Sequence, residues 1–295
     1  MAQEKAKVAT NAPPKAAKSN KKAAPAFVKY YLFAYNVLST MGWAYILILT
    51  LIHVLDLDGK SSSIASTSPT ASFTLGRLFS SIPFLKTAQK INTVGGLEAR
   101  LHPLLVPFYR RAATTFGRVG VTTAWVQSCA LLEVVHVALG WVRSPLQTTA
   151  MQVSSRLFLV WGIVEQFASV RSNPLYTSMV FAWSLTEVIR YSFYACNLGG
   201  YEPYLLLYLR YTTFYVLYPL GASSEAFLIY ATLPSTSPIP SWSSWIMGMW
   251  KPSDYIRATL FLIWWPGLYI MYTHMIKQRR KTLGSGRTLA AKKTD

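Results

Sequence analysis

A tyrosine and a glutamate seven residues apart are the side chains in this sequence best suited to acid–base chemistry. They lie in the segment Leu217-Tyr218-Pro219-Leu220-Gly221-Ala222-Ser223-Ser224-Glu225. Seven residues are two helical turns, so Tyr218 and Glu225 would share one helix face and lie about 10 Å apart along the axis. Gly221 lies between them, where a missing side chain would leave room for a substrate. A phenol and a carboxyl facing one cavity can take a proton from one atom and give one to another.

Eight ionisable residues fall inside long apolar runs, where charge is costly and therefore suggests function. They are Glu133, His136, Arg156, Glu165, Glu187, Arg190, Arg210 and Glu225. Ion pairing between helices is the structural alternative, and Glu187 and Arg190 are spaced to pair on one helix. The pattern predicts that Arg156, Arg190 and Arg210 ring one mouth of a helix bundle. Guanidiniums bind phosphate groups bidentately, whereas snorkelling to lipid headgroups is the alternative reading.

The sequence lacks the residue patterns of several common reaction classes. The four histidines, at positions 53, 102, 136 and 274, form no H-x-x-H or H-x₃-H pair, which argues against a di-iron desaturase or hydroxylase. No G-x-G-x-x-G follows a predicted strand, so no nicotinamide site is indicated. Neither Cys129 nor Cys196 is followed by arginine six residues later, as a cysteine phosphatase requires. A reaction that needs only acid, base and positioning, with no metal and no redox cofactor, fits best.

Composition places these side chains in a membrane. Of the 295 residues, 52% are hydrophobic and only 14% are charged, whereas soluble domains carry about a quarter charged residues. The net charge is +18, of which +12 lies in residues 1–29 and 277–295. This concentration in the tails argues against a nucleic-acid partner. Basic tails are typical of the cytosolic side of a membrane, near anionic lipid headgroups.

Six apolar runs are long enough to cross a bilayer. They cover residues 31–54, 120–141, 150–170, 175–198, 204–232 and 256–276. Their continuous apolar character favours helices over barrel strands, and Pro219 predicts a kink in the fifth. The chain is thus predicted to be an all-α polytopic membrane protein, a bundle of six transmembrane helices over 30–276. A disordered basic tail over 1–29 and a second basic tail over 277–295 flank it, and the long loop 55–119 lies on the opposite face from the tails.

Short motifs follow one another along residues 30–281, except in most of 55–119. They are Tyr35-Asn36-Val37-Leu38-Ser39, Leu132-Glu133-Val134-Val135-His136, Val142-Arg143-Ser144-Pro145-Leu146, Gln152-Val153-Ser154-Ser155-Arg156, Ala182-Trp183-Ser184, Thr186-Glu187, Ile189-Arg190-Tyr191, Leu209-Arg210-Tyr211, and Leu217-Tyr218-Pro219 with Gly221 and Ser224-Glu225. In type and order these motifs resemble the membrane-embedded very-long-chain (3R)-3-hydroxyacyl-CoA dehydratases of fatty acid elongation, also called protein-tyrosine-phosphatase-like proteins. The loop 55–119 is longer than expected for that family.

The resemblance implies a reaction and a set of roles. It implies dehydration of a (3R)-3-hydroxyacyl-CoA to a trans-2-enoyl-CoA, without a redox cofactor, in a bundle with a tunnel for the acyl chain. Tyr218 and Glu225 would be the catalytic pair. The supporting residues would be Arg156, Arg190, Arg210 and Gly221. In the family the tyrosine is proposed as base and the glutamate as polariser of the hydroxyl. The reverse is also chemically sound, because an unperturbed phenol with a pKa of about 10 is a poor base at neutral pH.

The expected location is the endoplasmic reticulum membrane, with both termini in the cytosol. Lys292 and Lys293 form a dilysine retrieval pattern there. Expected partners are the acyl-CoA substrate, membrane lipids of the endoplasmic reticulum and other elongation-cycle enzymes. Two alternatives remain: a lipid-anion transporter, which would show flux without turnover, and a non-catalytic scaffold. Retention of Tyr218 and Glu225 argues against the scaffold.

Overall fold

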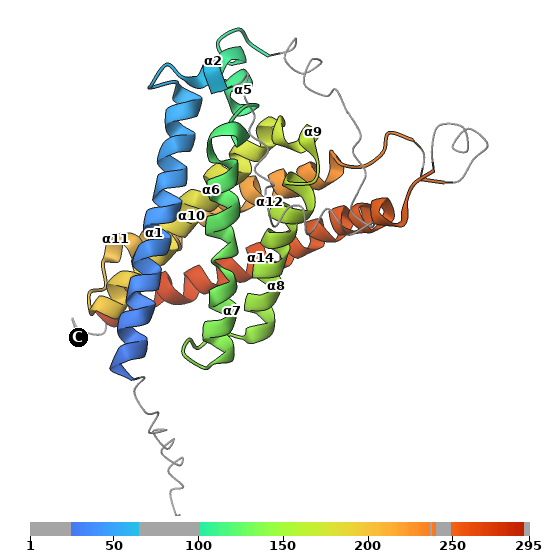
Figure 1. The fold of residues 1–295 in the computed structure, drawn as a ribbon. Helices are drawn as coiled ribbons and strands as arrows, with labels where there is room; N and C mark the ends of the chain where they lie inside the picture. Colours follow the sequence, from blue (N-terminus) through green and yellow to red (C-terminus); the bar gives the residue numbers. More distant parts are fainter. Residues whose placement is uncertain (1–24, 65–100, 237, 240–248, 292–295) are drawn as a thin grey trace, which may run out of the picture.

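A computed structural model describes residues 25–64, 101–236, 238–239 and 249–291, and the regular secondary structure in these ranges is helical throughout (Figure 1). The helices are α1 (Ala26–Leu55), α2 (Ser61–Ile64), α5 (Val106–Ala112), α6 (Phe116–Ser128), α7 (Leu131–Ala138), α8 (Leu146–Leu157), η2 (Phe158–Val164), α9 (Ala168–Arg171), α10 (Pro174–Gly199), α11 (Tyr204–Arg210), α12 (Phe214–Tyr230) and α14 (Pro252–Ala291). The predicted all-α fold class is confirmed for the described ranges.

Helices cover all six of the predicted apolar runs, although three of the runs are divided. The first and fourth runs lie in α1 and α10, and the sixth lies inside α14. The second becomes α6 and α7, the third chiefly α8 and η2, and the fifth α11 and α12. Two segments, Ala26–Leu55 and Phe116–Ala138, are long and apolar enough to cross a membrane by length and composition. Six membrane-crossing helices and an acyl-chain tunnel go beyond this finding and stay predictions.

Two irregular stretches interrupt these helices. The fifth run breaks at Tyr211–Thr213, before Pro219, and α12 continues through that proline, although Pro219 has no N–H for the carbonyl one turn earlier. The third run contains the π-helical stretch Phe158–Val164, a wide turn that often marks functional sites. The first irregularity precedes Glu225 along the chain and the second directly follows the helix that carries Arg156.

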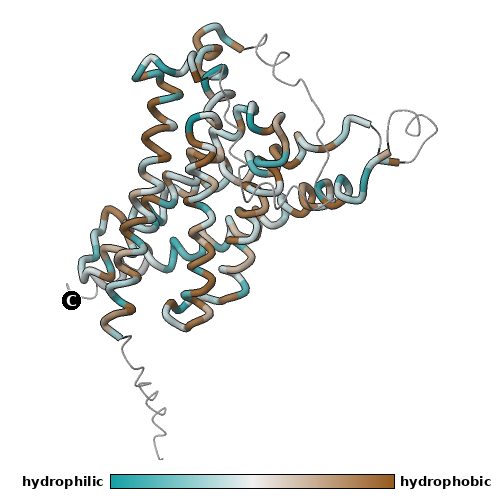
Figure 2. The backbone as a smooth tube through the Cα atoms, in the orientation of Figure 1, coloured by the Kyte–Doolittle hydropathy of each residue, from teal (hydrophilic) through white to brown (hydrophobic). Residues whose placement is uncertain are grey.

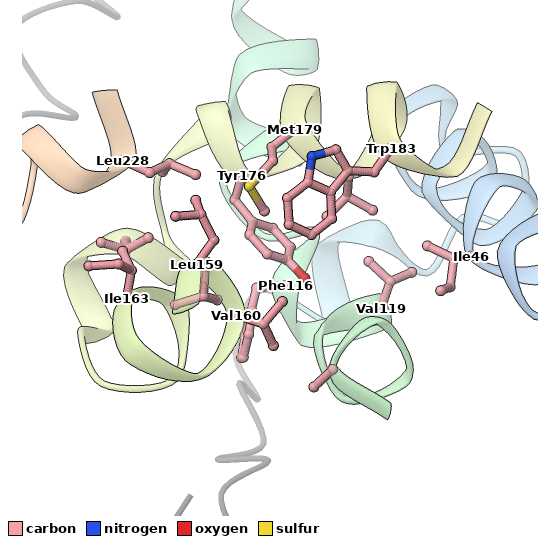
Figure 3. Packing of buried hydrophobic residues seen from close by; sticks show 14 of the residues in the cluster. Ile46, Phe116, Val119, Leu159, Val160, Ile163, Tyr176, Met179, Trp183 and Leu228 are labelled. Atoms are coloured by element: carbon pink, nitrogen blue, oxygen red, sulfur yellow. The ribbon is translucent and has the colours of Figure 1, made fainter. Parts of the chain in front are cut away.

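The central helix of the bundle is α10. It packs against α1, α11 and α12, and α12 packs against α14. Figure 3 shows Tyr176, Met179 and Trp183 projecting from α10 toward apolar side chains of the neighbouring helices, among them Val119 and Leu159. Each of these five residues is at most 2% exposed. Close packing of such side chains holds membrane helices together through van der Waals contacts, so this core fixes the rotation of α10 about its axis.

The outer surface of the bundle is rich in large apolar side chains. On α1 the exposed ones are Phe27, Tyr30, Phe33, Leu38, Met41, Tyr45, Ile48, Leu51 and Leu55. Figure 2 shows hydrophobic residues along much of this helix. Soluble monomers rarely expose contiguous apolar surface on this scale, whereas a lipid environment accommodates it. The surface of α1 therefore fits the membrane environment predicted from composition.

The two ends of the bundle hold different connections. The start of α1, the α7–α8 connection, α11 and the end of α14 lie at one end, and α2, α5 and α9 lie at the other (Figure 1). At this second end Asp56 pairs with Arg111 at 3.0 Å and Asp58 pairs with Arg118 at 2.5 Å. The hydrogen bond from Arg118 is the main cause that lowers the pKa of Asp58 to about 2. These pairs tie the end of α1 to α5 and α6.

Parts of the predicted tails and loop fall outside the described ranges. Residues 65–100 of the loop 55–119 are among them, as are residues 1–24 and the pair Lys292-Lys293. The helix α1 begins at Ala26, so the last residues of the tail expected to be disordered are helical. The helix α14 likewise extends to Ala291, well into the predicted C-terminal tail.

Candidate active site

One face of α10 carries a row of polar side chains. Trp183, Glu187, Arg190 and Tyr194 are spaced i, i+4, i+7 and i+11 along this helix, which places them on one side. At 1.5 Å per residue the row runs about 16 Å along the axis. Side chains from α7, α8, α11 and α12 contact it. We call these four residues the α10 row.

At the first position of the α10 row, Trp183 meets the carboxylate of Glu225 from α12. The indole nitrogen of Trp183 donates to Glu225 Oε1 at 2.6 Å, and that of Trp264 from α14 donates to Oε2 at 3.1 Å. Glu225 is partly buried, and Trp183 is 2% exposed. Each carboxylate oxygen thus accepts one hydrogen bond from a rigid ring, which fixes the orientation of Glu225.

Arg156 of α8 connects this carboxylate to the next position of the row. Its guanidinium carbon lies 4.8 Å from the centre of the Trp183 ring, a cation–π contact, and it forms an ion pair with Glu187. Trp183 thus contacts both Arg156 of α8 and Glu225 of α12, two of the predicted site residues.

A charge network continues along the row from Glu187. This carboxylate accepts ion pairs from Arg156 and from Arg190, the latter at 2.5 Å. Arg190 in turn binds both oxygens of Glu133, at 2.7 and 2.9 Å, and Tyr191 donates to the same Glu133. The pairing of Glu187 with Arg190 predicted from their spacing is confirmed. Two guanidiniums and two carboxylates balance, and they join α7, α8 and α10.

Arg210 lies at the other end of the α10 row. It donates to the Tyr194 hydroxyl at 2.8 Å, and its guanidinium carbon lies 4.5 Å from the centre of that ring and 5.1 Å from Phe193. Within the described ranges it forms no ion pair with a carboxylate, unlike Arg156 and Arg190. The three arginines thus follow the α10 row, two of them sharing Glu187 and the third set apart.

Tyr218 and Gly221, the other predicted site residues of α12, lie beside α14 and α10 respectively. The Tyr218 ring stacks beside Tyr272 of α14, with centroids 6.4 Å apart. A Cβ atom at Gly221 would lie 3.4 Å from Ala182 Cβ and 3.9 Å from the Trp183 ring. Both distances are ordinary van der Waals contacts, so α10 lies directly beside this glycine in the direction of a Cβ atom. The role of Gly221 in substrate binding stays a prediction.

His136, another ionisable residue of the apolar runs, is enclosed by aromatic rings. Its Nε2 lies 3.1 Å from the Tyr31 hydroxyl. The Tyr31 and Tyr35 rings meet it edge-on at 5.3 and 4.9 Å, and Trp141 stacks at 5.9 Å. With His136 only 2% exposed, this enclosure joins α1 to α7 and favours the structural reading of that histidine.

Sequence reasoning does not identify Trp183 and Trp264 as site residues. Trp183 does carry a signal, since it lies four residues before Glu187 and so on the same face of α10. Trp264 carries no such signal, because its approach to Glu225 depends on how α14 packs against α12.

Comparison with known proteins places the chain in a family. Residues 127–285 match the family described as "Protein tyrosine phosphatase-like protein, PTPLA". A Schizosaccharomyces pombe protein named "Probable very-long-chain (3R)-3-hydroxyacyl-CoA dehydratase" is 44% identical over 170 residues, 57% of this chain and 77% of that protein. The Caenorhabditis elegans "Very-long-chain (3R)-3-hydroxyacyl-CoA dehydratase hpo-8" is 34% identical over 267 residues, 88% of this chain and 97% of the other.

A human relative shows the same kind of similarity over a shorter stretch. "Very-long-chain (3R)-3-hydroxyacyl-CoA dehydratase 2" of Homo sapiens is 42% identical over 160 residues, 53% of this chain and 63% of that protein. No solved structure matches the fold significantly. Both the matched stretch 127–285 and the near full-length similarity to the nematode protein include the α10 row, Tyr218 and Glu225. The chain belongs to the protein tyrosine phosphatase-like (PTPLA) family.

Proposed function

We propose that this protein dehydrates (3R)-3-hydroxyacyl-CoA to trans-2-enoyl-CoA in very-long-chain fatty acid elongation. The names of the relatives describe this activity for those proteins. In this chain the observation that carries the proposal is the Glu225 carboxylate, held by two indole N–H groups, with Arg156 over one of those indoles and Tyr218 seven residues earlier on the same helix. Elimination of water requires one group that takes a proton and one that gives a proton, and this pair can supply both.

In the proposed reaction Tyr218 and Glu225 divide two proton transfers. One group removes the C2 proton, which the neighbouring thioester carbonyl makes acidic, and the other protonates the hydroxyl that leaves C3 as water. The C2–H and C3–O bonds break, the C2–C3 double bond forms, and transfer of one proton between the two groups restores the pair. Enolate-like charge on the thioester oxygen requires a donor or a cation, and Arg156 is the proposed one.

The CoA head is proposed to bind along the α10 row, with Arg156, Arg190 and Arg210 as its arginines and Gly221 beside the reacting end. Arg210 is the best suited of them to a phosphate, because no carboxylate of the described ranges neutralises it. The row of about 16 Å suits an extended pantetheine arm between thioester and phosphates. The acyl chain would then enter the apolar interior of the bundle.

The proposed setting is the endoplasmic reticulum membrane. Six crossings by α1, α6–α7, α8–η2, α10, α11–α12 and α14 would put both termini in the cytosol, and the start of α1 and the end of α14 do lie at one end of the bundle (Figure 1). Other elongation-cycle enzymes are the proposed partners. Protease treatment of sealed microsomes tests this topology: a tag after Asp295 should be removed without detergent, and its survival would refute a cytosolic C-terminus.

Turnover by the purified protein tests the function. The protein in detergent or nanodiscs is incubated with a long-chain (3R)-3-hydroxyacyl-CoA, and the trans-2-enoyl-CoA is quantified by mass spectrometry. The expected result is product from the wild type, far less from Glu225→Gln, and little from the (3S) substrate. Binding of the thioester by folded protein without any product would overturn the proposal in favour of carriage or scaffolding.

A further inference from the structure

The two indoles at Glu225 suggest how the roles of the pair are divided. Trp183 and Trp264 approach from different helices and donate to different oxygens of one carboxylate, at 2.6 and 3.1 Å. An indole N–H is a donor only, so these contacts require acceptor oxygens on Glu225. The other lone-pair site of each oxygen remains available to accept a proton.

Burial opposes charge on the Glu225 carboxylate, and the groups around it act in the opposite direction. Hydrogen bonds donated to the charged form favour it, as does a nearby cation. The groups that interact with Glu225 electrostatically are Arg156 from α8 and Tyr218 from its own helix, while α10 and α14 present their indoles. Arg156 also lies over the ring of Trp183 at 4.8 Å, which holds that indole in place and strengthens its N–H as a donor.

We infer that Trp183 and Trp264 are positioning residues that hold Glu225 as a carboxylate, so that Glu225 is the base that removes the C2 proton. This inference rests on the proposed function. Glu225 forms an O–H bond with the proton from C2, while the phenol of Tyr218, which is protonated at neutral pH, gives its proton to the leaving hydroxyl. Transfer of the proton from Glu225 to the Tyr218 phenolate then restores both groups, and the released water completes the balance.

The test removes one N–H and keeps an aromatic ring. Trp264→Phe is the primary variant, because Trp264 is only partly buried; Trp183→Phe is the second. The matched control is Trp265→Phe: Trp265 is 37% exposed and packs its ring against Phe227 and Phe261. Thermal unfolding of each purified variant shows that the compared proteins are folded.

A positioning role predicts effects that a purely structural role would not produce. Loss of one hydrogen bond to a charged group should lower kcat for Trp264→Phe about 10- to 100-fold, with KM within about twofold of wild type. The acid limb of the kcat/KM profile should move to higher pH, because the carboxylate loses a donor that favours its charged form. Trp264→His, which restores a ring N–H, should recover part of kcat. Trp265→Phe should keep wild-type kcat and pH profile.

The outcomes separate this inference from the proposed function. A folded Trp264→Phe protein with wild-type kcat and an unmoved acid limb would overturn the inference while the wild type still makes product. A lower melting temperature with unchanged kcat in both indole variants would assign the two tryptophans to packing alone, and would overturn it as well. No product from the wild type would overturn the proposed function itself, and the inference with it.

Discussion

Arg190 binds both carboxylate oxygens of Glu133, a residue 57 positions earlier in the chain, at 2.7 and 2.9 Å. The contact joins α10 to α7, and both side chains are partly exposed. Together with the pairs that Glu187 forms with Arg156 and Arg190, it gives a carboxylate partner to two of the three arginines expected to bind phosphate. In the proposed site Arg156 and Arg190 would therefore hold helices together as well as line the α10 row, whereas Arg210 pairs with no carboxylate of the described ranges.

Removal of Glu187 should chiefly destabilise the fold. Glu187→Gln leaves two guanidiniums facing each other without their shared carboxylate, whose side chain is only 4% exposed. Breaking a buried ion pair by removing one partner typically costs about 3–5 kcal/mol, so the melting temperature in detergent should fall clearly. The control is Glu202→Gln, an exposed residue between α10 and α11, which should melt like the wild type. Equal melting of both variants would show that the network contributes little stability.

Arg210→Ala should act mainly on substrate affinity. A phosphate contact is made in both the ground state and the transition state, so its loss raises KM and leaves kcat nearly unchanged. A charged hydrogen bond is worth about 1.5–3 kcal/mol, which corresponds to a KM roughly 10- to 100-fold higher. The control variant is Arg143→Ala, an exposed arginine in the α7–α8 connection.

The substrate supplies a second control for Arg210. A 3-hydroxyacyl-pantetheine thioester has the same reacting atoms and lacks the phosphates of CoA. Wild type and Arg210→Ala should therefore turn it over with similar KM. An Arg210→Ala protein with wild-type KM for the CoA thioester, or an equal loss on both substrates, would contradict phosphate binding by this arginine.

The outline of the fold and the pair on α12 follow from the sequence, because each depends on local spacing. Apolar runs of about 20 residues predict the six helical regions, and a spacing of seven predicts that Tyr218 and Glu225 share a face. Spacing alone cannot show which side chain of another helix reaches a given residue. For that reason the partners of Glu225, namely Arg156, Trp183 and Trp264, appear only when the helices are packed.

The arginines illustrate the same limit. Their depth along each predicted span suggests a common mouth, but depth contains no information on helix rotation. In the structure the rotation of α10, fixed by its apolar core, turns Glu187 toward Arg156 and leaves Arg210 beside Tyr194. The same limit applies to Gly221. The sequence shows that a side chain is missing there, but not whether a cavity or a neighbouring helix lies beside the backbone. Here α10 lies beside the glycine, at ordinary van der Waals distance from a Cβ atom.

Acid should weaken the contact between Asp58 and Arg118. The hydrogen bond from Arg118 lowers the pKa of Asp58 to about 2, below the ordinary value of about 3.9 in an unfolded chain. A lowered pKa in the folded state means that the contribution to stability is present above about pH 4 and is lost as the pH falls toward about 2. Asp58→Asn should therefore melt below the wild type at neutral pH, and the difference should shrink between about pH 4 and 2. A difference that does not change with pH would contradict this role of the ion pair.

Tyr218 and Glu225 should behave as one proton-transfer unit. Tyr218→Phe removes only a hydroxyl and keeps the ring beside Tyr272, and Glu225→Gln keeps the shape and removes the ionisable group. Each should lower kcat by roughly 10²- to 10⁴-fold, the usual worth of a positioned acid or base. The matched control is Tyr230→Phe, a 56% exposed tyrosine at the end of the same helix, which should keep wild-type kcat.

The double variant distinguishes a unit from two independent contributions. If proton removal at C2 and protonation of the leaving hydroxyl occur in one elimination, loss of either group disables the step in which the other acts. Tyr218→Phe combined with Glu225→Gln should then lose little more than the worse single variant, because members of a catalytic unit are not additive. Fold losses that multiply in the double variant would indicate independent roles. A well-folded Tyr218→Phe protein with near-normal turnover would remove the tyrosine from the mechanism, because phenylalanine has no hydroxyl that could transfer a proton.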